Sequence, residues 1–272
     1  MDSFFKLQVA ERERAYPPRI HYHGDYEVYY LTEGRCRYFI HNKTYAMTAG
    51  DIVMIPPGQI HKVMYETPVH SRILFNCTRD YIPDSVIPFL AQIAHFPDNP
   101  DTARSVAELY RKLQDAVSSP DVFSQDTIRC CVMQLFLLIA GASVHNKPLS
   151  VSSPIVEQAV AHIRSNFMDR ITLTDTARHC AVSPEHLSRV FKKETGFGFN
   201  EYLNLYRLKK AEALLKTGQV RSVSRVALQC GFNDSNYFSG MYKKVYGVPP
   251  SLVRKQSEGV LSDGGEKYEV NV

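Results

Sequence analysis

Two stretches of the sequence, HLSRVFKKETG at residues 186–196 and YFSGMYKKVYG at residues 237–247, are copies of one pattern. At an offset of 51 residues, both contain a large apolar residue, a serine, an aromatic residue, two lysines and a final glycine. Upstream, Ala177 and Cys180 match Ala227 and Cys230 at an offset of 50. Because a repeated segment is one supersecondary unit present more than once, this duplication decides the fold of the second half of the chain.

Each copy has the residue pattern of a helix-turn-helix. A short first helix carries a small alanine on its inner face, which lets a second helix approach closely, and a tight turn follows, with Gly231 in the second copy. Ser183 and Asn233 are the predicted N-caps of the second helices, with Pro184 at the favoured first position in one of them. A pair of amphipathic hairpins that serves as a scaffold is the structural alternative.

The segment between the two copies, FNEYLNLYRLKKAEALLK at residues 199–216, predicts one continuous helix that ends at Gly218. At 1.5 Å per residue it spans roughly 27 Å, which allows two recognition helices to enter successive major grooves on one face of DNA. Its cations lie either near backbone phosphates or on a solvated helix face: Arg207, Lys209, Lys210 and Lys216.

The net charge of +4 is the sum of unlike segments. Residues 151–255 contain 16 Lys and Arg against 8 Asp and Glu, a net charge of +8. Residues 1–150 contain 15 against 16, and residues 256–272 contain 1 against 4. A near-neutral first half followed by a basic block favours an effector domain joined to a nucleic-acid-binding domain.

Residues 154–252 resemble the DNA-binding domain of the arabinose-regulator (AraC/XylS-type) family of bacterial transcription factors. The matching residues are LSRVFKKETG at 187–196, the segment from Ala227 to Phe232, and GVPP at 247–250. The resemblance implies sequence-specific binding of double-stranded DNA, with RNA polymerase as a further candidate partner. Gly240 stands where the family usually has arginine, whereas the first copy keeps Arg189, and this departure predicts a weaker second reader.

The positions that match the family's recognition helices supply the candidate DNA contacts. We expect Arg189 to read base edges and Lys193 to position the phosphate backbone. The complete candidate set is Glu185, His186, Ser188, Arg189, Lys192, Lys193, Ser235, Asn236, Ser239 and Lys243.

The first half of the chain is rich in predicted strands between residues 19 and 76. Turn-forming residues interrupt it every 7–10 residues or so, which is typical of a small β-barrel or sandwich. Within it, HYHGDYEVYYLTEG at 21–34 and GDIVMIPPGQIH at 50–61 are similar to the two motifs of the cupin barrel. The regulator family commonly carries such a barrel as its effector domain.

The cupin-like motifs contain a candidate ligand set. His21, His23 and Glu27 have the same parity, so on extended strands they project to one face, and His61 enters from a neighbouring strand. Three imidazoles and a carboxylate suit Fe, Mn, Ni or Zn, so a divalent metal is one reading; hydrogen bonding to an effector and plain structural histidines are the others. No other cofactor is expected.

The barrel interior is expected to bind a small polar effector, and sugars are common effectors in the family. The candidate effector-binding residues are polar or charged: Arg19, His21, His23, Glu27, Tyr29, Tyr38, His61, His70 and Arg72.

Two helices are predicted after the barrel, over residues 101–118 and 125–141. The second is apolar on nearly every side, through Ile128, Val132, Leu135, Phe136 and Ile139 and through Cys131, Met133, Leu137 and Leu138 on its remaining faces. Because a monomer rarely exposes a large apolar patch, this pattern predicts a homodimer. The alternative is that helix 101–118 covers the exposed side within one chain.

The sequence thus predicts an α+β multidomain protein. Residues 1–141 form a cupin-like β-barrel with helices for effector binding and dimerisation, and residues 142–153 a linker. Residues 154–256 form an all-α domain with two helix-turn-helix motifs, and residues 257–272 a disordered tail. The main functional alternative is a metal-dependent cupin enzyme with an accessory helical domain; an architectural DNA-binding protein without ligand control is a third.

Other features narrow the class and the location. No nucleophile–base pair or phosphate loop is visible, so the protein is not expected to be an enzyme. The six cysteines lack metal-ligand spacing, the N-terminus does not read as a signal peptide, and the longest uncharged run, Cys130 to Asn146, is too short and polar to span a bilayer of ~30 Å. These features predict a cytoplasmic protein with no membrane partner.

Overall fold

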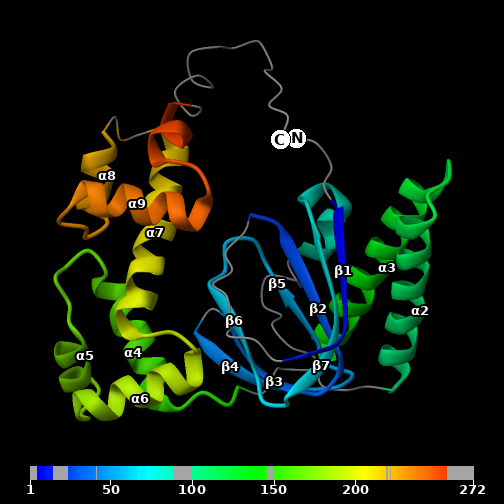
Figure 1. Ribbon diagram of the computed structural model, residues 1–272, viewed down its shortest axis with the longest axis horizontal. Helices are drawn as coiled ribbons and strands as arrows, with labels where there is room; N and C mark the ends of the chain where they lie inside the picture. Colours follow the sequence, from blue (N-terminus) through cyan, green and yellow to red (C-terminus); the bar gives the residue numbers. More distant parts are fainter. Residues whose placement is uncertain are drawn as a thin grey trace. The chain divides into compact units, whose positions relative to one another are not determined.

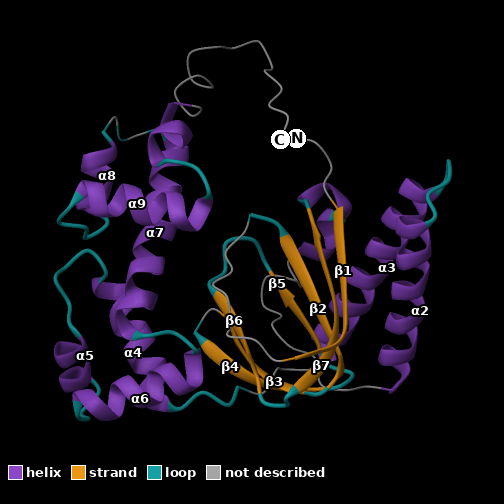
Figure 2. Ribbon diagram, viewed as in Figure 1, coloured by secondary structure: helices purple, strands orange, loops and turns teal. Residues whose placement is uncertain are grey.

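The computed structural model describes residues 5–14, 24–40, 42–87, 100–145, 150–218, 220 and 222–255. The chain divides into two compact units, a first that includes Met1–Pro154 and a second that includes Ile155–Lys192 and Phe197–Val272 (Figure 1). The first is β-rich and the second helical, which confirms the predicted fold class (Figure 2).

Two antiparallel sheets face each other in the first unit. The four-stranded sheet has the order β1-β7-β2-β5 and the three-stranded sheet the order β4-β3-β6. The strands are β1 (Phe5–Arg14), β2 (Tyr26–Glu33), β3 (Arg35–Ile40), β4 (Lys43–Thr48), β5 (Ile52–Ile55), β6 (His61–Tyr65) and β7 (Val69–Cys77). β1 lies outside the segment predicted to be strand-rich, and it pairs with β7 from Phe5 opposite Cys77 to Arg14 opposite Val69.

The four-stranded sheet is covered on both faces, which explains the continuous apolar run in β2. Tyr26, Val28 and Tyr30 pack into the cluster shared with the helices of this unit. Tyr29 and Leu31 point the other way, into the cluster between the two sheets. Alternate residues of one strand therefore serve two separate cores.

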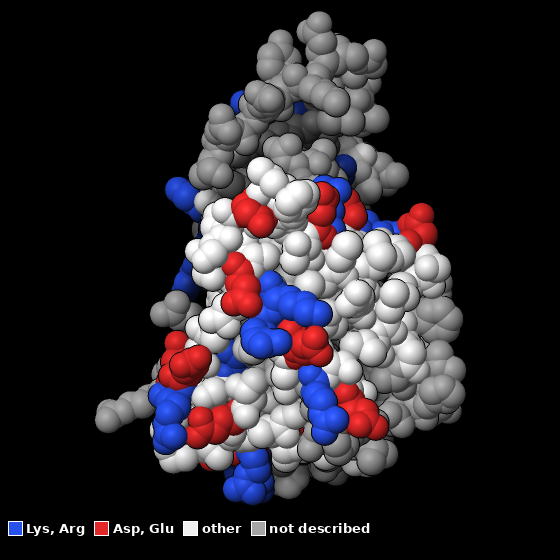
Figure 3. Space-filling view, turned by 90° about the vertical axis from the view of Figure 1, so that its right-hand side faces the viewer, with Lys and Arg blue, Asp and Glu red and all other residues white. Residues whose placement is uncertain are grey.

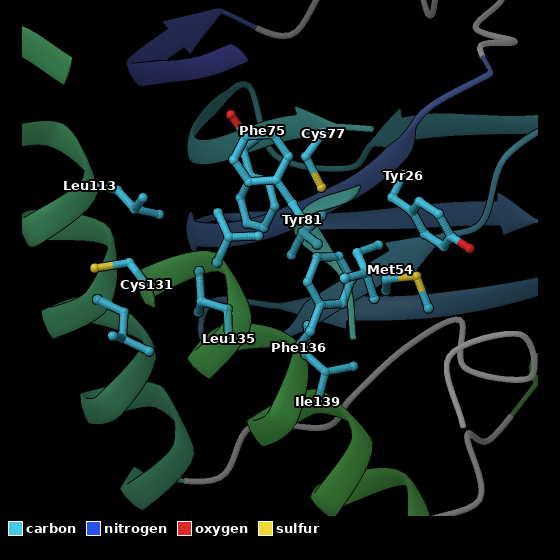
Figure 4. Close-up of a cluster of buried hydrophobic side chains, with 14 of the residues drawn as sticks. Tyr26, Met54, Phe75, Cys77, Tyr81, Leu113, Cys131, Leu135, Phe136 and Ile139 are labelled. Carbon is cyan, nitrogen blue, oxygen red and sulfur yellow. The ribbon is translucent and has the colours of Figure 1, made fainter. Parts of the chain in front are cut away.

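Helices pack on the outer face of the four-stranded sheet (Figures 1 and 2). They are the short 3-10 helices η1 (Arg79–Tyr81) and η2 (Asp84–Val86), and the long α2 (Pro100–Ser118) and α3 (Ser124–His145). Figure 4 shows Leu135, Phe136 and Ile139 of α3 among Phe75 and Cys77 of β7. The Phe136 ring meets the Phe75 ring edge-on, with centroids 6.1 Å apart, and each buried aromatic contributes about 1.5–3 kcal/mol.

The predicted linker, residues 142–153, is partly built into the first unit. α3 continues to His145, four residues past the predicted end at 141, because no glycine or proline interrupts residues 142–145. At the other end, Val151 donates its amide hydrogen to the Thr44 carbonyl at 2.8 Å, and Thr44 donates its amide hydrogen to the Ser152 hydroxyl at 2.6 Å. Residues 150–152 thus pair with β4, an edge strand of the smaller sheet.

The second unit consists of helices. They are α4 (Pro154–Asn166), α5 (Leu173–His179), α6 (Pro184–Thr195), α7 (Phe199–Thr217), α8 (Val223–Gln229) and α9 (Ser235–Tyr246). α5 and α6 form the first helix-turn-helix, and α8 and α9 form the second. α7 joins them as predicted and ends at Gly218, whose φ of 65° is left-handed. The predicted tail, residues 257–272, lies outside the described residues.

Within the ranges that the structure describes, no helix is long and apolar enough to cross a membrane.

Candidate DNA-binding surface and effector cavity

The turns of the two helix-turn-helix motifs adopt the same left-handed backbone conformation with different residues. Gly231 has φ 82°, and a Cβ there would lie 2.5 Å from the Phe167 carbonyl oxygen. The matching position of the first motif is Ala181, which adopts a φ of 54° despite its side chain. The left-handed conformation is therefore present in both turns, strained in the first and relaxed in the second.

The recognition helices begin at side-chain caps. Ser183 accepts a hydrogen bond from the His186 amide at 3.2 Å, so the predicted cap of α6 is confirmed. The prediction that Asn233 caps α9 is wrong. Asp234 is the cap, and its carboxylate accepts from the amides of Asn236 and Tyr237 at 2.7 and 3.1 Å. Asp234 matches Ser183 at the offset of 51, and the one inserted residue of the second copy belongs to the turn.

The inner faces of the motifs are apolar and buried, as their spacing predicted. Leu187 and Phe191 of α6 are completely buried, as are Phe238 and Tyr242 of α9. The small residues Ala177 and Ala227 are buried where the first helix of each motif approaches the second. The opposite faces of α6 and α9 are thereby fixed toward solvent.

The outer face of α6 presents most of the candidate DNA contacts of the first motif. His186 is half-buried, and its Nδ1 lies 3.2 Å from the Arg189 guanidinium nitrogen Nη2. This contact holds the arginine across one turn of the helix. The exposed candidates on this helix are Glu185, Ser188, Arg189, Lys192 and Lys193.

The outer face of α9 offers fewer polar groups. Asn236 and Lys243 are exposed, but Ser235 and Ser239 are half-buried. The Ser239 hydroxyl donates to the Ser235 carbonyl at 2.8 Å, so it is engaged within its own helix. A Cβ added at Gly240 would meet nothing within 4 Å, so the position where the family has arginine faces open space.

The cations of α7 do not form one phosphate-binding face. Arg207 is 9% exposed and donates to the carbonyl oxygens of Phe167 and Asp169, both at 2.8 Å. It ties α7 to the end of α4, so neither predicted position, near phosphates or on a solvated helix face, is correct for this residue. Lys216 pairs with Glu212 at 2.7 Å.

Lys209 of α7 is half-buried, and Lys210 lies against an aromatic ring. Burial, followed by the positive charges of Lys210 and Arg164, lowers the pKa of Lys209 to about 8. The Lys210 ammonium lies 5.5 Å from the centroid of the Tyr206 ring, a cation–π distance.

A cavity of about 340 Å³ opens in the first unit, lined by residues of both sheets. Five predicted effector-binding residues line it, Glu27, Tyr29, Tyr38, His61 and Arg72. His70 is buried outside this lining, stacked on Tyr65 and 3.9 Å from Glu13. The other three candidates, Arg19, His21 and His23, lie outside the described residues.

Glu27 is the central polar group of the cavity. It is 3% exposed, and its carboxylate accepts hydrogen bonds from the Tyr38 hydroxyl at 3.1 Å and the Asn76 amide at 3.3 Å. Burial, and then the charge of Glu27, raises the pKa of Tyr38 well above its usual value, so the phenol remains a donor. The His61 Nε2 atom lies 3.9 Å from Glu27 Oε1.

Sequence reasoning missed part of the lining because it did not predict β1. Lys6 and Gln8 reach the cavity from β1, and Leu74 and Asn76 reach it from β7, where the same alternation that places Arg72 could have identified them. The remaining lining residues are Asp25, Lys62, Val63 and Tyr65.

The proposed metal ligands are described only in part. Glu27 and His61 meet in the cavity, while His21 and His23 lie outside the described residues. Among the residues that the structure describes, no three His, Cys, Asp or Glu side chains are grouped to hold a metal ion.

Comparison with known proteins assigns both units. Residues 8–126 match the model of the AraC-like ligand-binding domain, and residues 176–256 match a helix-turn-helix domain model. A ligand-binding domain joined to a DNA-binding domain defines a transcriptional regulator. The chain belongs to the AraC family of these regulators.

Relatives of similar length support this assignment. The chain is 25% identical over 264 residues to the uncharacterized HTH-type transcriptional regulator YfiF of Bacillus subtilis, covering 93% of this chain and 83% of that protein. It is 25% identical over 254 residues to the HTH-type transcriptional activator RhaS of Escherichia coli O81, covering 89% of each. These relatives are regulators, which favours the regulator over the metal-dependent enzyme.

Solved structures of the same kind are also similar. ToxT from Vibrio cholerae O395 is 17% identical with a TM-score of 0.41, over 94% of this chain and 98% of that one. The C-terminal domain of AraT, a response regulator from Geobacillus stearothermophilus, is 35% identical with a TM-score of 0.37, over 39% of this chain and 88% of that one.

Proposed function

We propose that the cavity of the first unit binds a small, hydroxyl-rich effector and that this binding controls how the helix-turn-helix unit engages its operator. The observation that carries the proposal is Glu27, a carboxylate kept in a cavity with hydrogen-bond donors already arranged around it. A buried carboxylate accepts hydrogen bonds from sugar hydroxyls, and the aromatic rings of Tyr29 and Tyr65 flank the same space. A monosaccharide suits this chemistry.

Thermal unfolding of the full chain with a panel of monosaccharides tests this proposal. A ligand that binds the folded state raises the midpoint by mass action, and Glu27→Gln should abolish the rise. Glu33→Gln is the matched control, because it removes a carboxylate from the same strand at a position outside the cavity lining. A sugar that stabilises both variants equally would show that it binds elsewhere.

A divalent metal is a second candidate occupant of the cavity. The His61 Nδ1 atom lies 2.8 Å from the Gln59 carbonyl oxygen, so it carries the proton there and Nε2 is left facing Glu27. That tautomer is the one a metal-ligating histidine adopts. Elemental analysis of the purified chain, compared with His61→Ala, decides between metal and no metal.

The outer surface of α3 supports the proposal of a homodimer. Met133 is 43% exposed and Leu137 51% exposed, although α2 packs beside this helix. Leu137 and Leu138 line a groove with Leu109 of α2. Figure 3 shows this side of the molecule, where an uncharged area lies beside a group of acidic and basic side chains. Pairing two copies here would bring two DNA-binding units to adjacent half-sites.

Sedimentation of the full chain tests the dimer. Leu137→Glu should shift a dimer to monomer at tens of micromolar, whereas Gln114→Glu, which places the same new charge on exposed α2, should not. A wild-type chain that sediments as a monomer would refute the proposal.

Whether the protein activates or represses transcription is proposed from a relative. RhaS is an activator by name, so we propose activation, with RNA polymerase as the partner of the DNA-bound chain. The cytoplasm is the proposed location, in keeping with DNA as the target and with cysteines that are all thiols, five of them buried.

A further inference from the structure

Tyr237 is a large aromatic residue that the second recognition helix leaves in solvent. It is the third residue of α9 and is 53% exposed, although the phenylalanine next to it is completely buried. Its neighbour on the other side, the candidate DNA contact Asn236, is also exposed. The phenol therefore lies at the end of α9 where a helix-turn-helix meets DNA.

The Tyr237 side chain is held in place from two directions. The Asn204 amide nitrogen, on the connecting helix α7, lies 3.3 Å from the Tyr237 hydroxyl and donates to it. The Phe232 ring, in the turn of the same motif, lies 6.4 Å away between centroids, tilted by 54°. An exposed side chain with such supports loses less conformational entropy on binding than an unsupported one.

The direction of the Asn204 hydrogen bond decides what the hydroxyl can do. Because Asn204 is the donor, the Tyr237 oxygen is the acceptor, and its own proton points elsewhere. A phosphate oxygen of DNA accepts hydrogen bonds and has none to give. We propose that Tyr237 donates this proton to a backbone phosphate and that Asn204 is the positioning residue that orients it.

Several groups that often bind phosphate at the start of a recognition helix are engaged or absent in α9. The Asp234 carboxylate occupies the amides of Asn236 and Tyr237, so these amides are not available to a phosphate, as they are at many helix N-termini. Gly240 supplies no arginine, and Ser239 uses its hydroxyl within the helix. Tyr237 thus gives the second motif a neutral phosphate contact at the start of α9, where residues 235–240 contain no lysine or arginine.

The test measures binding of the full chain to two duplexes, one recovered by selection from a random pool and one of random sequence. Tyr237→Phe removes one hydroxyl and should weaken binding to both by about tenfold. The slope of log K against log salt should not change, since no charge is lost. Tyr242→Phe is the matched control, because it removes the same atom from the same helix at a position that is 0% exposed.

Two results would overturn the contact. Unchanged affinity in Tyr237→Phe, with a thermal midpoint equal to that of the wild type, would show that the hydroxyl does not touch DNA. A loss confined to the selected duplex would show that it reads a base edge instead of a phosphate.

The role of Asn204 is tested by reversing its hydrogen bond. In Asn204→Asp the carboxylate would accept the phenol's proton, so the loss of affinity should be larger with Tyr237 present than in the Tyr237→Phe background. Asn204→Ala should cost less than Asn204→Asp. Equal losses of Asn204→Asp in both backgrounds would show that the new charge acts alone, and the positioning role would be wrong.

Discussion

The two helix-turn-helix motifs share a backbone but divide their chemistry differently. The first begins its recognition helix with neutral Ser183 and places Arg189 on the outer face, at the cost of a strained Ala181 in its turn. The second has a relaxed glycine turn but no arginine in its recognition helix, which Asp234 caps. The first motif thus has the arginine that we expect to read bases, and the second has the turn with less backbone strain.

The largest effect is expected at the turn of the second motif. Gly231→Ala would place a Cβ 2.5 Å from the Phe167 carbonyl oxygen in a left-handed conformation, and should cost about 2–4 kcal/mol in the free energy of unfolding. Urea denaturation measures it. The matched change in the first motif, Ala181→Gly, relieves backbone strain. It should raise the free energy of unfolding by between about zero and 1 kcal/mol. Similar changes in the free energy of unfolding at both turns would show that the two turns do not differ in backbone strain.

Loss of the exposed arginine comes next. Arg189→Ala should cost about 1–3 kcal/mol on a selected duplex and relax the preference at one base pair. Lys193→Ala, four residues along α6, should weaken selected and random duplexes alike, because we expect this lysine to contact phosphate. Fluorescence anisotropy with both duplexes measures the difference. Equal losses on both duplexes for Arg189→Ala would remove its role as a base reader.

Restoring the arginine should make the second motif resemble the first. Gly240→Arg enters open space, so we expect tighter DNA binding by about 1 kcal/mol and a salt slope steeper by about one. Gly240→Ala separates the charge from helix propensity, since it should add about 0.5–1 kcal/mol of stability without changing the salt slope. An arginine variant that binds like the alanine variant would place this face of α9 away from DNA.

The smallest effect is a pH dependence confined to the first motif. His162 of α4 stacks on His179 of α5 with ring centroids 4.3 Å apart, and the pKa of His162 is lowered by burial first and by His179 second. A lowered histidine pKa means that the unfolded chain binds the proton more readily. The free energy of unfolding should thus be unaffected by His162 above about pH 6.5. It should fall as the pH drops from there toward the lowered pKa of His162 in the folded state.

Hydrogen exchange at α5 and α8 between pH 7.5 and 5.5 measures this effect. The second copy contains no histidine, so α8 should respond less than α5. His162→Gln should remove the difference, and His186→Gln, an outer-face change, should retain it. Equal acid sensitivity of the two helices in the wild type would contradict the assignment.

The duplication made the helical unit easy to predict, while buried charges and β1 were hard. Apolar spacing located both recognition helices because each buries one side, and α7 was located as the uninterrupted stretch between the two copies that ends at Gly218. Arg207 was misjudged because nothing in a single sequence distinguishes a cation that binds carbonyl oxygens from one that faces water. Adjacent Asn233 and Asp234 are both good caps, and only the register of the repeat selects the second. Lys6 and Gln8 were missed because the charged run ERER at 11–14 follows them directly, although Phe5, Leu7 and Val9 alternate with them as in a strand.

Because β1 pairs with β7, we expect the two units to fold at different times as the chain emerges from the ribosome. Phe5 pairs with Cys77, which lies far along the chain, whereas the helices that pack together within each helix-turn-helix lie close in sequence. Contacts of such long range close slowly, so the four-stranded sheet is expected to form late for its size and the helical unit rapidly. Until β7 is synthesised, β1 has no strand to pair with, and we expect its charges at Lys6, Glu11, Arg12, Glu13 and Arg14 to oppose association with other nascent chains.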